Sequence, residues 1–218
     1  ANVVVGVVDD QTLVAHSLDE NQRWHYQHRL DGLPRVAGNV VVATGEDTLL
    51  ALASDDGELL WERKVLGRLR GAGDDGETTL VSVASLSEKR SIVLAIDRSG
   101  SVVRQIDEEA LVGDPVIFDE FAFLPWNRRL VVIFDLVDGR EKARVVSSSA
   151  VSHAFLLGDE LFFGEESAVR FDGDIVAARA GGGSRVEVPQ RPWILPVPPV
   201  WLGRGDVTLP SHATAQDM

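Results

Sequence analysis

A pattern of short apolar runs and Gly/Asp turns recurs about every 40 residues along this 218-residue chain. Its best copy spans residues 33–61. The Asn-Val-Val-Val run at residues 39–42 repeats the run at residues 2–5, and Trp61 repeats Trp24, so two landmarks share an offset of thirty-seven positions. A period of this length, built from short strands, is typical of the four-stranded blades of a β-propeller.

Three looser copies extend the recurrence. They start at residues 79–83, 121–124 and 161–164, and each apolar run leads on to a Gly/Asp turn. We therefore predict an all-β chain, a β-propeller with about four to five four-stranded blades. Propellers typically close with about 4 to 8 blades. Three cases stay open: a small closed ring, an incomplete ring that another chain completes, or a piece of a longer protein.

Local patterns place strands and turns inside each copy. Residues 40–44 and 49–53 are β-branched and aliphatic runs around a hairpin break. After a turn at residues 55–57, the period of two puts Leu59 and Trp61 on one face of the next strand. No apolar set at helical spacing persists. The acidic stretch at residues 107–111 is the one helix candidate, and because Gly and Pro follow it, we expect a loop or a single turn there.

The pattern ends before the C-terminus, so we expect blades over residues 1–175 and a Gly/Pro-rich extension over residues 176–218. The Gly-Gly-Gly-Ser run at residues 181–184 is typical of a flexible link. The prolines that follow cannot donate to a strand ladder, which excludes a central strand. The extension is either a strap on the domain or a polyproline-like ligand for another protein. The candidate partner-binding residues are its apolar members, Trp193, Ile194, Leu195 and Trp201.

Composition excludes several classes of function. Lysine and arginine number 21 against 34 aspartate and glutamate, giving a formal charge of -13, which opposes nucleic-acid binding. No apolar run approaches the roughly 20 residues that span a bilayer. Without cysteine, the sequence offers no disulfide, no thiolate metal ligand and no thiol nucleophile. The N-terminus lacks the basic region of a signal peptide, so we expect a mature chain or a processed piece of one.

The second copy carries a family resemblance. Residues 51–61, Ala-Leu-Ala-Ser-Asp-Asp-Gly-Glu-Leu-Leu-Trp, resemble the Ala-x-Asp-x-x-Thr-Gly-x-x-x-Trp signature of PQQ-type repeat propellers. Ala53 and Asp56 replace the usual Asp and Thr, while Arg104 and Ala143 stand at the tryptophan position of the third and fourth copies. The resemblance covers about residues 1–175. The structural repeat positions that it implies are Trp24, Trp61, Gly57, Gly100 and Gly139, and each tryptophan is expected to cover the neighbouring sheet.

This family includes quinoprotein dehydrogenases and non-enzymatic, BamB-like scaffolds of the bacterial envelope. An enzyme of the first kind would need a calcium cage and a catalytic aspartate. The acidic pairs at residues 9–10, 55–56 and 74–75 instead read as turn residues, and no ordered calcium loop is present. His25 and His28 fall on opposite faces of a strand, which makes them poor joint metal ligands. We therefore assign no catalytic, cofactor-binding or metal-binding residue and expect no cofactor.

The resemblance and the missing catalytic patterns favour a non-enzymatic scaffold that mediates protein–protein interactions in a larger assembly. Its partners would be proteins, one of which could complete the propeller, and neither nucleic acid nor a membrane span is expected. Partners could add a strand at an uncovered sheet edge or contact the proline-rich segment. The competing interpretation is a fragment of a quinone-dependent dehydrogenase or of a carbohydrate-binding or carbohydrate-processing propeller. The compartment is suggested only by the resemblance, which indicates the periplasm or cell envelope of bacteria.

Overall fold

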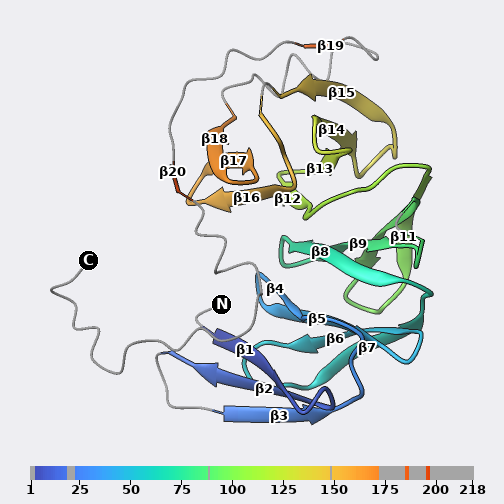
Figure 1. Ribbon diagram of the computed structural model, residues 1–218, viewed down its shortest axis with the longest axis vertical. Helices are drawn as coiled ribbons and strands as arrows, with labels where there is room; N and C mark the ends of the chain where they lie inside the picture. Colours follow the sequence, from blue (N-terminus) through green and yellow to red (C-terminus); the bar gives the residue numbers. More distant parts are fainter. Residues whose placement is uncertain are drawn as a thin grey trace, which may run out of the picture.

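The computed structural model describes residues 3–18, 23–87, 89–147 and 149–171, together with two short strands at 185–186 and 195–196. These residues form five sheets that follow one another in chain order, and all their strand pairs except β15–β19 are antiparallel. Figure 1 shows them along an arc, from the first sheet (blue) to the fourth and fifth (yellow and orange). The sequence-based prediction of an all-β propeller with about four to five blades is confirmed, and the described sheets are consistent with an incomplete ring.

The first three sheets use one continuous stretch of chain. The first has the order β1-β2-β3 and the second the order β4-β5-β6-β7, while the third reads β11-β10-β9-β8. Their strands are β1 (Val3–Val8), β2 (Thr12–Ser17), β3 (Arg23–Gln27), β4 (Arg35–Ala37), β5 (Val40–Gly45), β6 (Thr48–Ala53), β7 (Leu59–Lys64), β8 (Arg68–Asp74), β9 (Thr78–Ala84), β10 (Ser91–Asp97) and β11 (Val102–Glu108).

The last two sheets each include a short strand from the C-terminal segment. In the fourth sheet that strand, β19, lies parallel to β15, and in the fifth sheet β20 lies antiparallel to β18. The boundary between blades and extension at residue 175 stays a prediction. The strands are β12 (Val116–Phe118), β13 (Phe121–Trp126), β14 (Leu130–Asp135), β15 (Glu141–Val146), β19 (Arg185–Val186), β16 (His153–Leu157), β17 (Glu160–Gly164), β18 (Ser167–Arg170) and β20 (Leu195–Pro196).

Most local predictions agree with these strands, and two do not. Leu59 and Trp61 do not share a face, because a register shift pairs Trp61 with Ala51 but Leu59 with Leu52, and Leu60 is the neighbour that packs in the Trp61 cluster. The hairpin predicted between residues 40 and 53 is formed by β5 and β6. The expected loop at residues 107–111 is wrong at its start, because Asp107 pairs with Ile92 and Glu108 with Ser91 at the end of β11. Exposed acidic side chains are compatible with an outer strand, since only one of its edges is hydrogen-bonded. No helix that could cross a membrane occurs in the part of the chain described here.

Successive sheets pack face to face, and this packing forms the core. Val41 and Ala43 of β5 contact the first sheet through Leu13, Ala15 and neighbours, whereas Val40 and Val42 contact the third. β5 is therefore buried on both faces, which explains why the sequence of residues 40–43 is continuously apolar instead of alternating. Two further apolar clusters join the third sheet to the fourth and the fourth to the fifth.

The first sheet lacks, among the described residues, a strand at the β1 edge that corresponds to β4 of the second sheet. The offset of thirty-seven residues aligns β1 with β5, but β5 pairs with both β4 and β6, whereas β1 pairs only with β2. The outward face of β1 is also open. Val4 is 53% exposed and Val8 is 49% exposed, while Val41, the counterpart of Val4, is fully buried.

Each of the two repeated tryptophans covers the glycine turn of the next sheet. A Cβ atom on Gly57 would lie 2.6 Å from the Trp24 ring, and one on Gly100 would lie 2.7 Å from Trp61 Cβ. Both glycines also have positive φ. The close tryptophan side chain and the backbone conformation therefore each require glycine at these two positions. The Trp24 Nε1–H also donates a hydrogen bond of 2.9 Å to the Ser54 carbonyl.

Arg104 takes the same position at the turn of the fourth sheet. Its side chain lies over Gly139, where a Cβ would be 3.1 Å from Arg104 Nε. Nε–H donates to the Leu136 carbonyl at 3.1 Å, and Nη2–H donates to the Val137 carbonyl. Hydrogen bonds to turn carbonyls thus replace the ring contact. Ala143, at the tryptophan position of the fourth sheet, is buried in the cluster shared with the fifth.

We predict that Trp61→Ala lowers the melting temperature more than Arg104→Ala does. The Trp61 side chain is 5% exposed within the cluster between the second and third sheets, and its truncation should cost about 3–5 kcal/mol. Arg104 is exposed, so losing its hydrogen bonds should cost about 1 kcal/mol. Differential scanning calorimetry of both variants checks this order, and equal melting temperatures would contradict it.

Candidate functional site

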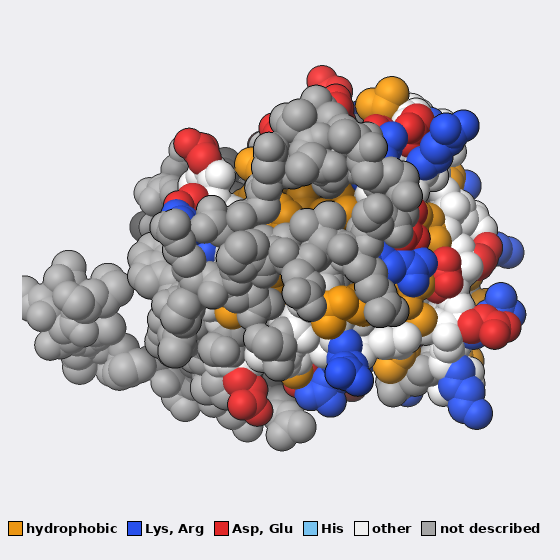
Figure 2. Space-filling model, turned by 90° about the horizontal axis from the view of Figure 1, so that it is seen from above, with side chains coloured by type: hydrophobic (Ala, Val, Ile, Leu, Met, Phe, Trp, Pro, Cys, Tyr) orange, Lys and Arg blue, Asp and Glu red, His pale blue; other side chains and the backbone are white. Residues whose placement is uncertain are grey.

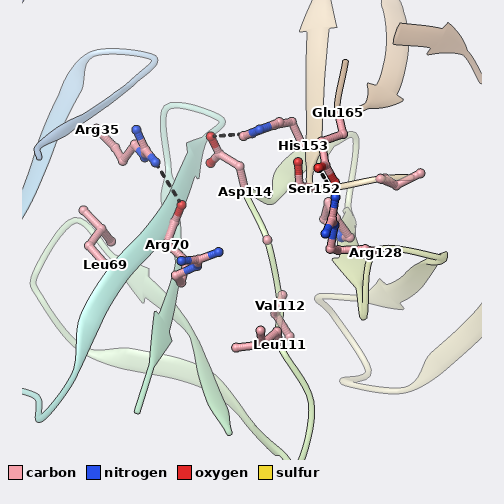
Figure 3. Close-up of a pocket in the computed structure, with 13 residues that line it drawn as sticks. Arg35, Leu69, Arg70, Leu111, Val112, Asp114, Arg128, Ser152, His153 and Glu165 are labelled. Carbon is pink, nitrogen blue, oxygen red and sulfur yellow. Dashed lines mark hydrogen bonds and ion pairs between the residues drawn. The ribbon is translucent and has the colours of Figure 1, made fainter. Parts of the chain in front are cut away.

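A cavity of about 400 Å³ lies where the first strands of the second to fifth sheets converge. Figure 3 shows Arg35 and Arg70 on one side of it, Arg128 with Glu165 on the other, and Asp114 with His153 between them. Arg35 belongs to β4, Arg70 to β8 and His153 to β16, while Asp114 precedes β12. Four consecutive sheets thus build the site, and each contributes cavity-lining side chains from its first strand or from residues next to that strand.

The segment at residues 111–114 joins three sheets beside this cavity. The Gly113 amide donates to the Pro125 carbonyl at 2.8 Å, and the Gly113 carbonyl accepts a hydrogen bond of 2.6 Å from Ser82 Oγ in the third sheet. The Asp114 amide donates to the Ser152 carbonyl at 2.7 Å. A Cβ on Gly113 would lie 2.1 Å from that same carbonyl oxygen. Only glycine allows the fourth and fifth sheets to approach so closely.

The Asp114 carboxylate extends this connection to the third sheet. Its Oδ1 accepts a hydrogen bond of 2.9 Å from the Ala72 amide, and its Oδ2 lies 3.6 Å from His153 Nδ1. A Cβ on Gly71 would lie 2.2 Å from Oδ1, so the strand must carry glycine at this point. The Asp114 side chain therefore contacts both the third sheet, at Ala72, and the fifth sheet, at His153, beside the cavity.

The three arginines of the cavity differ in their partners. Arg128 forms a two-point ion pair with Glu165, with Nε to Oε2 at 2.8 Å. Arg35 Nη2 donates only to the Arg70 carbonyl at 3.3 Å, and the buried Arg35 Nε has no partner among the described residues. Likewise, no carboxylate of the described part of the chain pairs with the Arg70 guanidinium. With two carboxylates against three guanidinium groups, the cavity carries net positive charge.

The acidic pairs that the sequence places in turns do not form a metal site in the described regions. No group of three or more His, Asp or Glu side chains gathers there to hold an ion. Asp74 accepts a hydrogen bond of 3.2 Å from the turn amide of Gly76, as the turn interpretation expects, but it ends β8 and its side chain is only 1% exposed. Its carboxylate is satisfied by Arg98 Nη2 at 2.9 Å and by Thr79 Oγ1 at 3.0 Å. Asp74 is thus a structural ion-pair partner.

The aspartate of the third-sheet turn is held ionised by its own loop. Asp97 Oδ1 accepts hydrogen bonds from Ser99 Oγ at 2.6 Å and from the Ser101 amide at 2.9 Å. The Ser99 side chain, followed by the Ser101 amide, lowers the Asp97 pKa below its ordinary value. In the fourth sheet burial opposes ionisation of Asp135, but amides of Asp138 and Val137 still leave its pKa lowered.

Most of the proposed partner-binding residues, Trp193, Ile194 and Trp201, lie outside the described residues. Leu195 belongs to β20, where it is the backbone partner of Ala168. Sequence reasoning did not find the cavity residues. The available signal was the position of the lead-in strands, because Arg35, Asp114 and His153 all lie within or directly before the strand that opens a sheet.

The described side chains visible on one face of the molecule do not gather charge of one sign. Figure 2, seen from above, shows acidic and basic side chains next to one another, with hydrophobic side chains between them. A protein with a formal charge of -13 that lacks a continuous basic face on this side offers no electrostatic path to a phosphate backbone there. The net positive cavity stands apart from this mixed surface.

Comparisons with known proteins agree with the fold. The family model described as outer membrane protein assembly factor BamB matches residues 9–188. The crystal structure of BamB from Moraxella catarrhalis is similar, with 19% sequence identity, a TM-score of 0.52 and coverage of 84% of this chain and 56% of that chain. The computationally designed Ika8 protein gives 14% identity, a TM-score of 0.57 and coverage of 79% and 56%. The chain thus spans little more than half of either; a comparison with curated proteins finds no match.

We predict that Asp114→Ala lowers the free energy of unfolding by about 1–3 kcal/mol, because the Ala72 amide loses its acceptor. Asp114→Asn keeps a side-chain oxygen in place and should recover part of the loss. Urea unfolding of the three proteins measures the difference. Equal unfolding free energies for Asp114→Ala and the parent chain would show that the carboxylate does not hold the third sheet.

We also predict that Ser99→Ala raises the pKa of Asp97 toward its ordinary value. Because the folded-state pKa is lowered, the stability that this carboxylate contributes is present at neutral pH and is lost as the pH falls below about 4. Carboxyl NMR titration measures the pKa directly. An unchanged pKa in Ser99→Ala would refute the assignment.

Proposed function

The chain belongs to the PQQ-repeat family of outer membrane protein assembly factor BamB, and from this premise we propose that it is a non-enzymatic scaffold that binds protein partners in a larger assembly. The observation that carries the proposal is the unpaired edge of β1. The backbone groups on this edge of β1 are open to pairing with a strand that is not among the described residues. A protein partner that supplies such a strand would extend the arc of blades.

The sequence of β1 suits strand addition. Its six residues, Val-Val-Val-Gly-Val-Val, contain no charge and no proline, the features with which proteins usually block exposed edges. In the second sheet, β4 lies antiparallel to β5 with Ala37 opposite Val40 and Arg35 opposite Val42. By the thirty-seven-residue offset, an added strand would lie opposite Val3 and Val5.

Two finer features of the role are also proposals. We place the protein in the bacterial cell envelope, by analogy with the family's name. The extension at residues 176–218, set off from blades over residues 1–175, would contribute a second contact to partners through its apolar residues Trp193 to Trp201. Backbone pairing of β19 and β20 with the fourth and fifth sheets places two points of this extension beside the blades.

The test compares tagged chains used to capture partners from a native extract of the source. The double variant Val4→Lys and Val8→Lys adds charge beside the β1 edge, and Val137→Lys is the control at a more exposed turn position away from β1. We expect the parent chain and Val137→Lys to bind the same partner at one fixed ratio, measured by light scattering. The double variant should lose that partner because lysine opposes edge pairing.

Two results would contradict the proposal at different points. A partner that binds the double variant as well as the parent chain would exclude the β1 edge as the binding site. Monomeric chains without a partner in every eluate would exclude the scaffold role itself.

A further inference from the structure

We propose that the cavity between the second and fifth sheets binds a carboxylate group attached to a small apolar body, with Arg35 and Arg70 holding the carboxylate. This inference concerns a ligand site and does not depend on the scaffold role. It rests on the unmatched guanidinium groups, on the apolar wall of the cavity and on its size.

Arg35 and Arg70 are the charged groups of the cavity that lack an acidic partner among the described residues. Arg128 is neutralised by Glu165, but Arg35 donates only to a backbone carbonyl and its buried Nε donates to nothing described. A buried donor without an acceptor costs free energy that a bound oxyanion would recover. In a chain of net charge -13, two adjacent unpaired arginines facing one cavity call for a ligand with negative charge.

The remaining polar groups favour a carboxylate over a doubly charged phosphate. The Asp114 carboxylate lies between the two sides of the cavity and would repel a dianion more strongly than a monoanion. A guanidinium group matches the planar carboxylate with two parallel hydrogen bonds. Asp114 is held in place by the Ala72 amide, so it cannot turn away to make room for a larger charge.

The apolar side chains that line the cavity favour a ligand with an apolar body. Val112 and Val151 line the cavity but are almost completely buried, whereas Leu69 and Leu111 line it with partly exposed side chains. Burial of a short hydrocarbon group against them would add affinity in proportion to its area. A cavity of about 400 Å³ lies in the range of small-molecule sites. A carboxylate with an apolar body occurs both in free organic acids and at the C-terminus of a peptide that ends in an apolar residue.

The test is an NMR titration of the full chain with hexanoate, with hexanamide as the uncharged control. A short peptide that ends in a free leucine carboxylate, paired with its C-terminal amide, tests the second source. We expect the carboxylates, and not the amides, to shift backbone signals of residues 69–72 and 112–114. Binding by hexanoate alone assigns the site to a free acid, binding by the peptide alone assigns it to a chain terminus, and either supports the proposal.

Variants locate the binding groups. Arg35→Gln and Arg70→Gln should each weaken carboxylate binding about tenfold, because each removes a charge-assisted hydrogen bond. Arg68 is an exposed residue of β8, the strand that carries Arg70, and it does not line the cavity. Arg68→Gln should therefore leave the affinity unchanged. Arg70 is exposed, so Arg70→Gln keeps the test valid if Arg35→Gln fails to fold. Equal binding of hexanoate and hexanamide, no shifts with either carboxylate, or unchanged affinity in Arg70→Gln would overturn the proposal.

Discussion

Burial of each inner strand on both of its faces is the interaction on which this structure depends. Val40 and Val42 of β5 pack against the third sheet while Val41 packs against the first, so no sheet completes its core alone. Each blade must have a neighbour on either side, which explains why the arrangement continues from sheet to sheet. The first sheet has a neighbouring sheet on one face only among the described residues, so Val4 and Val8 of β1 are exposed.

The same convergence of sheets builds the cavity. Strands that open successive blades approach one another, and the segment at residues 111–114 ties the third, fourth and fifth sheets together by backbone and side-chain hydrogen bonds. Asp114 is committed to this structural role and forms no ion pair with Arg35 or Arg70 among the described residues. The hydrogen bonds that connect the sheets and the arginines without an acidic partner therefore lie beside the same cavity, which the convergence of the sheets creates.

The sequence predicted the repeating features and missed those that depend on contacts between copies. Strands and turns follow from local alternation and from Gly/Asp signals, so the hairpin of β5 and β6 was predictable. The substitution of Arg104 for tryptophan was visible, but its hydrogen bonds to the next turn were not. Asp74 read as a turn residue because no local signal reveals its partner Arg98, twenty-four positions away. The cavity escaped prediction for the same reason, since its residues come from four different sheets.

Hydrogen–deuterium exchange of the chain, alone and with a captured partner, tests most directly whether the arc offers an open edge for assembly. In the isolated chain, amides of β5, β9 and β13 should be strongly protected, whereas β1 should exchange much faster. Partner binding should then slow exchange in β1 more than in any other described strand. Protection of β1 equal to that of β5 in the isolated chain, or no change in β1 on binding, would contradict the account.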